Sequence, residues 1–124
     1  MTDKEITVEL ARFMGWKIAP EKWDGQWLHD DANFPCYDPR TGTVCEKPRG
    51  IPWRDWSPLT DWRHAMELAR SDGVGAETLL REVRIMALKA YFPPGDEAAW
   101  LLERATPRDL ALCVVRAVGI EAGK

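Results

Sequence analysis

Long apolar runs and cysteine are both scarce in this sequence. No stretch approaches the roughly 18 apolar residues of a membrane-spanning helix, and three cysteines are too few, and odd in number, for a disulfide framework. The opening segment MTDKEITVELARF mixes acids into its apolar positions and has no cleavage-site pattern of a signal peptide. We therefore expect no membrane association and a reducing compartment, the cytoplasm.

A strong net charge is also missing. The chain has 17 Lys and Arg against 20 Asp and Glu, a formal net charge of −3, and the two signs are interspersed. Domains that bind nucleic acid usually carry a basic patch or stripe. The charge balance therefore argues against nucleic acid as the main partner.

Catalytic and metal-binding motifs are few. The histidines are His29 and His64, and His29 lies beside two aspartates, which suits acid–base chemistry but equally fits a solvated polar turn. No nucleophile elbow or HExxH motif is present. Cys36 and Cys45 are symmetric about the segment DPRTGT and, joined by His29 or His64, are candidate zinc ligands, but the usual CxxC spacing is absent. We expect no catalysis, cofactor or metal, and we place Cys113 in the core.

What the sequence does contain is a globular composition with much tryptophan. Hydrophobic residues make up 45% and charged residues 30% of 124 residues, which predicts one folded domain over 1–124. The seven tryptophans either fill a small core or anchor a binding surface. We expect Trp16 and Trp62 to be mainly structural, because Trp16 follows a helix stop and Trp62 lies on a helical apolar stripe.

Capping residues and apolar periodicity predict three helices. The first runs from about Asp3 to Met14 after a capping box at Thr2, the second from about Asp61 to Ser71, and the last from the Thr106-Pro107 start to Gly119. The expected apolar face of the second helix is Trp62, Ala65, Met66 and Ala69. That of the last helix is Leu110, Cys113, Val114, Ala117 and Val118.

Turn residues predict two hairpins, one before and one within a long Pro- and Trp-rich loop at about 30–57. One hairpin pairs Trp16–Ala19 with Gln26–His29 around Asp24-Gly25, and the other pairs Cys36-Tyr37 with Val44-Cys45. Residues 76–105 fit either a helix or two strands around FPPGDE. Together these patterns predict an α/β (α+β) domain with helices packed on an antiparallel or mixed sheet.

Three segments, in this order, carry a family resemblance: ELARFMGWKI (Glu9–Ile18), WSPLTDWRHAMELA (Trp56–Ala69) and ATPRDLALCVVRAVG (Ala105–Gly119). The chain resembles the phage ABA sandwich family of small phage and prophage proteins. The resemblance implies an ABA-sandwich-like fold with a strand-rich middle, which favours the hairpin interpretation of Glu82–Arg104. It implies no catalytic motif or cofactor. By analogy with small phage proteins it suggests an anti-defence (anti-CRISPR-like) inhibitor in the host cytoplasm.

The expected function is therefore binding of a host protein, and the alternative is binding or sequestering of a small ligand such as a nucleotide. We expect the working surface on the loop between Lys47 and Trp56, because prolines restrict its backbone and Trp and Arg dominate binding hot spots. The expected partner-binding residues are Lys47, Arg49, Trp53, Arg54 and Trp56. An exposed apolar patch would favour a protein partner, and a pocket with converging Arg and Trp would favour a ligand.

Overall fold

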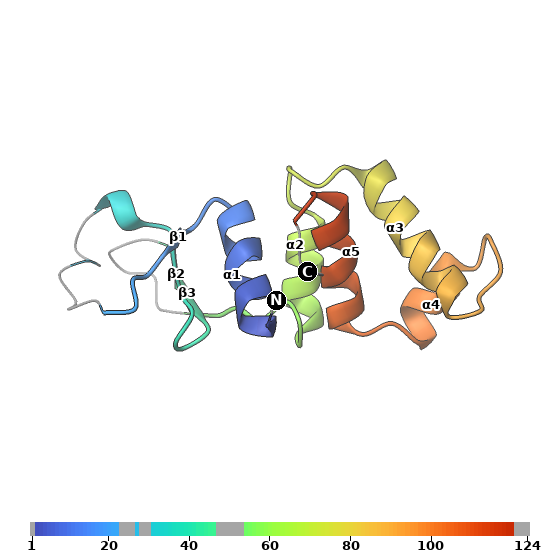
Figure 1. Ribbon diagram of the computed structural model, residues 1–124, viewed down its shortest axis with the longest axis horizontal. Coiled ribbons are helices and arrows are strands. Elements are labelled where there is room, and N and C mark those ends of the chain that lie inside the picture. Colours follow the sequence, from blue (N-terminus) through green and yellow to red (C-terminus); the bar gives the residue numbers. More distant parts are fainter. Residues whose placement is uncertain (1, 23–26, 28–30, 47–53, 121–124) are drawn as a thin grey trace. The chain divides into compact units, whose positions relative to one another are not determined.

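A computed structural model describes residues 2–22, 27, 31–46 and 54–120 of the chain (Figure 1). The described residues contain helices and a four-stranded mixed sheet, so the predicted α+β fold class is confirmed. The chain divides into two compact units, Met1–Ser57 and Pro58–Lys124, and each is described by itself. The prediction of one domain over 1–124 stays a prediction.

The first unit begins with helix α1 (Asp3–Phe13), as its capping signal predicted. The Glu5 N–H donates to Oγ1 of Thr2 at 3.2 Å, which satisfies one of the N–H groups that a helix start leaves without a partner. Ile6 and Leu10 are buried on one face. Gly15 has φ +88°, the left-handed conformation in which the chain leaves the helix.

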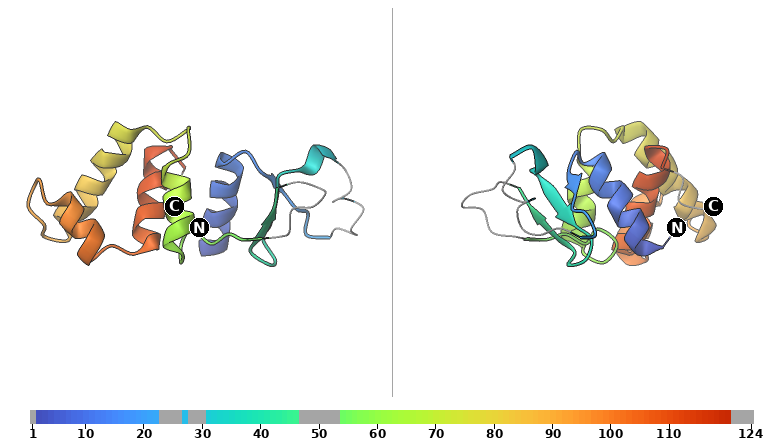
Figure 2. Two further views of the ribbon diagram at one scale, coloured as in Figure 1. Left: turned by 180° about the vertical axis from the view of Figure 1, so that it is seen from behind. Right: turned by 60° about the vertical axis from the view of Figure 1, so that its left-hand side comes forward.

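The sheet of the first unit has the order β1-β2-β3-β4 (Figure 2). Strand β1 (Lys17–Ile18) runs parallel to β2 (Cys36–Asp38), β2 is antiparallel to β3 (Thr43–Cys45), and β3 is antiparallel to β4 (Arg54–Asp55). The hairpin predicted around DPRTGT is confirmed in register, since Cys36 lies opposite Cys45. The region predicted as a long loop at about 30–57 therefore contains three strands, and also a 3-10 turn, η2 (Asp31–Asn33).

The other predicted hairpin is wrong in its pairing. Strand β1 pairs with β2, because the Lys17 N–H donates to the Pro35 carbonyl at 2.8 Å and the Ala19 N–H to the Tyr37 carbonyl at 2.9 Å. Of the expected partner strand Gln26–His29, Trp27 alone is among the described residues, and it has a 3-10 conformation. The predicted turn at Asp24-Gly25 lies outside the described residues.

The second unit is helical where it is described. Its helices are α2 (Trp62–Ala69), α3 (Ala76–Lys89), α4 (Glu97–Glu103) and α5 (Pro107–Ala117). Helix α5 contacts both α2 and α3 (Figures 1 and 2). The predicted start of α5 is confirmed: Thr106 and Asp109 form a reciprocal capping box, with Pro107 in the first turn.

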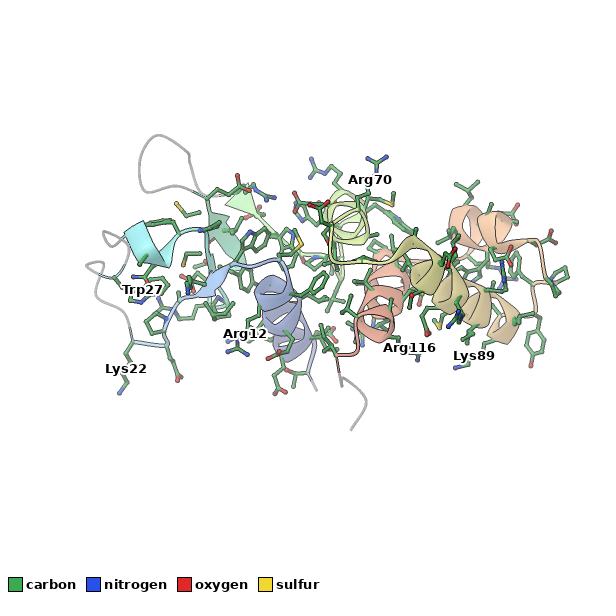
Figure 3. The ribbon with its side chains drawn as sticks, turned by 90° about the horizontal axis from the view of Figure 1, so that it is seen from above. Arg12, Lys22, Trp27, Arg70, Lys89 and Arg116 are labelled. Carbon is green, nitrogen blue, oxygen red and sulfur yellow. The ribbon has the colours of Figure 1, made fainter. Side chains whose placement is uncertain are left out.

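Residues 76–105 contain the two helices α3 and α4, and the hairpin interpretation of Glu82–Arg104 is wrong. Val83 and Ala87, one helical turn apart on α3, are buried with Trp100 of α4 and Cys113 of α5. The Arg116 side chain also reaches from α5 to the Met86 sulfur at 3.5 Å (Figure 3). In the α-helix that the structure shows over Ala76–Lys89, residues spaced by four lie on one side, and that side packs on α5.

The core side of α5 differs in detail from the prediction. Leu110, Cys113 and Val114 are buried as expected. Ala117 and Val118 are half-buried, whereas Ala111 and Val115 are buried. Since α5 contacts helices on two sides, its buried surface is wider than a single stripe.

Candidate functional site

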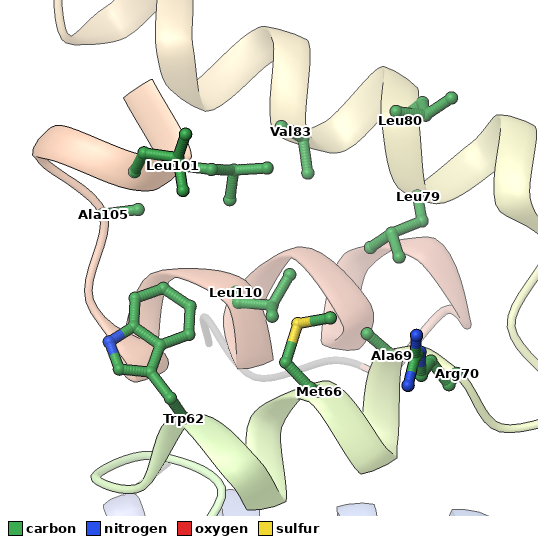
Figure 4. Close-up of a pocket in the computed structure, with 11 residues that line it drawn as sticks. Trp62, Met66, Ala69, Arg70, Leu79, Leu80, Val83, Leu101, Ala105 and Leu110 are labelled. Atoms are coloured by element: carbon green, nitrogen blue, oxygen red, sulfur yellow. The ribbon is translucent and has the colours of Figure 1, made fainter. Parts of the chain in front are cut away.

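An apolar groove opens on the helical unit, between α2, α3, α4 and the N-terminal part of α5 (Figure 4). Its volume is about 620 Å³, within the range of pockets that bind ligands. The lining residues are Trp62, Met66, Ala69, Arg70, Leu79, Leu80, Val83, Leu101, Leu102, Ala105 and Leu110.

Helix α2 presents one face to this groove and another to the core. Trp62, Met66 and Ala69 are spaced by four and three residues, so they lie along one side of the helix. Ala65 and Leu68 are the buried residues of α2. The predicted apolar stripe is thus mainly the groove wall. Trp62 is 39% exposed, so its ring is only partly covered, and its mainly structural role stays a prediction.

The groove exposes large apolar side chains. Met66 is 43% exposed, Leu80 of α3 is 54% exposed and Leu102 of α4 is 87% exposed. Leu110 of α5, which is buried, also lines the groove. Exposed apolar area costs roughly 25 cal/mol per Å² relative to burial, and contiguous apolar surface of this kind marks binding sites.

Arg70 is the charged member of the lining. It follows the last residue of α2, so it lies at one end of the groove while Trp62 lies at the other (Figure 4). Its guanidinium forms no ion pair or side-chain hydrogen bond with the residues that the structure describes. The groove is therefore apolar along its length and cationic at one end.

A smaller depression of about 240 Å³ adjoins the groove at Leu80, which lines both. Its other lining residues are Glu77, Arg81 and Arg84. Arg84 donates from Nε to Glu97 of α4 at 2.9 Å. Backbone hydrogen bonding at the start of α4, with the Arg84 contact second, keeps the pKa of Glu97 below its ordinary value. Arg84 is therefore engaged in linking α3 to α4.

The two expected surface residues that the structure describes, Arg54 and Trp56, do not form an exposed cluster. Lys47, Arg49 and Trp53 lie outside the described residues. Arg54 of β4 donates two hydrogen bonds to Glu46, from Nη2 at 2.7 Å and from Nε at 3.1 Å, and lies 5.7 Å over the Trp16 ring.

Trp56 is a core residue, so its assignment as a partner-binding residue is wrong. Its exposed fraction is 0%. The Trp56 ring meets Trp16 edge-on at 4.7 Å and Tyr37 edge-on at 5.7 Å, and its backbone N–H donates to the Gly42 carbonyl at 2.9 Å. These contacts fix the chain after β4 against the rest of the sheet.

The cysteines are buried free thiols. Burial, with the Asp38 charge second, raises the pKa of Cys36 to about 12, and burial raises that of Cys113 to about 11. Since the thiolate is the nucleophile and the metal ligand, both positions are held in the unreactive form. Of the candidate zinc ligands Cys36, Cys45 and His29, the last lies outside the described residues. Within the described ranges no three His, Cys, Asp or Glu residues come together as a metal-binding group.

His64 lies in the first turn of α2, where its Nδ1 is 3.9 Å from Oδ2 of Asp61. Asp61 caps this helix by accepting from the Arg63 N–H at 2.8 Å. Hydrogen bonds from Arg63 lower the pKa of Asp61 to about 2. The carboxylate is thus committed to the helix start, which is a structural role.

Comparison with family models, curated proteins and solved structures found no match to this chain. The resemblance to phage ABA sandwich proteins therefore stays a hypothesis. Among the helices of the described ranges, none combines the length and apolar character needed to cross a membrane.

Proposed function

We propose that this is a non-enzymatic binding protein that holds an apolar segment of a partner protein in the groove between α2, α3 and α4. The observation that carries the proposal is the groove lining: ten apolar residues and Arg70, with Leu80 and Leu102 more than half exposed. Such surface gains free energy when a partner covers it.

The same lining favours a protein segment over the alternative ligand, a nucleotide. A nucleotide brings several phosphate oxygens, and phosphate sites supply several donors from backbone N–H groups, Lys and Arg. Arg70 provides one guanidinium, and the remaining lining side chains are apolar. A groove with apolar walls and one charged end matches the apolar face of an amphipathic peptide instead.

In biological terms, we propose that the partner is a host protein and that the chain is a phage or prophage accessory protein that acts as an anti-defence inhibitor. This part rests on the resemblance of segments such as Trp56–Ala69 to phage ABA sandwich proteins. The groove is the surface by which such an accessory protein would engage its target. The same α2 segment supplies Trp62 and Met66 to the groove.

The test uses a fluorescein-labelled synthetic helix of about 15 residues, long enough to be partly helical in water. It carries Leu or Met at positions i, i+4 and i+7 and Gln elsewhere. We expect it to bind the parent protein, measured by fluorescence anisotropy. We also expect the indole N–H signal of Trp62 to shift in an NMR titration, since that ring lines the groove.

A matched pair of variants locates the binding. Leu80→Gln changes a groove residue that is 54% exposed, and Leu88→Gln changes a residue of the same helix that is 47% exposed and outside the lining. We expect Leu80→Gln to weaken binding by about five-fold or more, because the apolar contact is lost. Equal effects of the two variants, or no binding by the parent, would overturn the proposal.

A further inference from the structure

The two ends of the groove differ in charge. Arg70 lies in the lining at one end, and no acidic side chain is among the lining residues. Neither an ion pair nor a side-chain hydrogen bond joins Arg70 to another residue in the described ranges. An exposed cation next to apolar walls therefore has its charge available to an occupant.

The geometry limits the form of that occupant. The walls come from helices and the residues that follow them, so the described lining offers no strand edge to which an extended peptide could add. The wall formed by α2 runs from Trp62 to Ala69, and at 1.5 Å per residue this spans about 10–12 Å, or two helical turns. Two turns present apolar side chains at i, i+4 and i+7, the pattern by which helices are read in grooves.

We infer that the groove recognises an acidic amphipathic helix, with about two turns of apolar side chains along α2, α3 and α4 and a Glu or Asp facing Arg70. This inference rests on the proposed function and adds the chemistry of the partner. The apolar side chains supply most of the affinity, and the carboxylate sets which way round the helix lies. A basic amphipathic helix is disfavoured because its cations would meet Arg70.

The experiment compares three labelled peptides that differ at the one position placed beside Arg70, which is Gln, Glu or Lys. Exposed charge pairs change affinity modestly, so we expect the Glu peptide to bind about two- to five-fold more tightly than the Gln peptide. The Lys peptide should bind more weakly than the Gln peptide. The Glu preference should shrink as salt rises from about 0.05 M to 0.5 M, because screening shortens the reach of the charges.

Two protein variants assign the effect. Arg70→Gln removes the groove cation, and Lys89→Gln removes an equal charge from the last turn of α3, outside the lining (Figure 3). We expect the Glu preference to disappear in Arg70→Gln and to persist in Lys89→Gln. Because Arg70 is exposed beyond the end of α2, its replacement should leave the fold intact, which the melting temperature checks.

The outcomes separate the two proposals. If the Gln peptide binds but Glu and Lys peptides bind equally well, or Lys89→Gln acts like Arg70→Gln, the acidic-helix inference is overturned and the proposed function stands. If no peptide binds, both fail. If dodecanoate binds the parent and excludes the peptides in an Arg70-dependent way, the groove is a site for a small amphiphilic carboxylate, and the helix inference is again overturned.

Discussion

Replacing Trp56 with alanine tests the assignment of this residue to the core of the first unit. The side chain is 0% exposed and makes edge-on contacts with Trp16 at 4.7 Å and with Tyr37 at 5.7 Å. Truncating a buried Trp typically costs about 3–5 kcal/mol, and each aromatic pair adds about 0.5–1.5 kcal/mol beyond its buried area. Since these contributions overlap, we expect a loss of about 4 kcal/mol in the free energy of unfolding.

Such a loss is a large part of the roughly 5–15 kcal/mol by which small proteins are stable. Urea unfolding followed by far-ultraviolet circular dichroism measures it without relying on tryptophan fluorescence, which the substitution itself changes. The midpoint should fall with little change in slope. The groove lies in the other unit, so the variant should still bind the groove peptide under conditions in which it is folded.

Trp62→Ala is the matched control, because the residue type and the substitution are the same. Trp62 is 39% exposed and lines an open groove. Its truncation therefore leaves no closed cavity in the core and should lower the free energy of unfolding by about 1–2 kcal/mol. It should instead weaken binding of the groove peptide. The reasoning is refuted if Trp56→Ala costs less than about 1 kcal/mol, or if Trp62→Ala destabilises the protein equally.

Two further predictions concern stability. Thr106→Ala removes the capping hydroxyl that accepts from the Asp109 N–H at 3.2 Å, and should cost about 1 kcal/mol in urea unfolding; an unchanged midpoint would contradict the capping role. Cys36 and Cys113 have pKa values raised from 9.0 to about 12 and about 11. Above pH 9 the unfolded chain loses these thiol protons first, so stability should fall as pH rises from 9 toward 11, by up to about 1.4 kcal/mol per pH unit for each thiol. The double variant Cys36→Ala, Cys113→Ala should show a shallower decline, and an identical decline would exclude the thiols as its cause.

Local signals in the sequence predicted local structure well. The helix start at Thr106-Pro107 and the hairpin around DPRTGT each depend on residues within a few positions of one another, and both are confirmed. A tight turn also fixes strand register, which is why Cys36 was correctly placed opposite Cys45. The pairing of β1 with β2 was missed, because a parallel partner 19 residues along the chain (Lys17 with Cys36) leaves no turn signature between them.

Helix α3 was left undecided for a physical reason. Leu80, Ile85 and Leu88 are exposed on it, in addition to the inward Val83 and Ala87. Apolar residues on several sides weaken the helical period, so the sequence could also be interpreted as strands. Leu80 is one of these apolar residues outside the buried face, and it lines the groove. An exposed leucine that departs from the helical period of α3 was therefore the sequence signal that could have indicated the groove.

The apolar stripe on α2 shows why the groove itself could not be predicted. The spacing of Trp62, Met66 and Ala69 identifies one face of the helix, but spacing does not say whether that face meets the core or solvent. The neighbouring pair Ala65 and Leu68 took the core side. Trp56 shows the opposite error. As a Trp in a Pro-rich loop it was expected at a binding surface, but its packing against Trp16 and Tyr37 buries it.

The groove edge and the core of the helical unit draw on the same helices. Trp100 and three smaller residues, Val83, Ala87 and Cys113, form the buried cluster that joins α3, α4 and α5. Leu80 and Leu102, on α3 and α4, contribute little to that core because they are largely exposed. An occupant that covers them adds apolar burial to α3 and α4, so binding and the stability of these two helices are linked. The apolar surface of Leu80 and Leu102 that folding leaves exposed is therefore the surface whose burial can stabilise a complex.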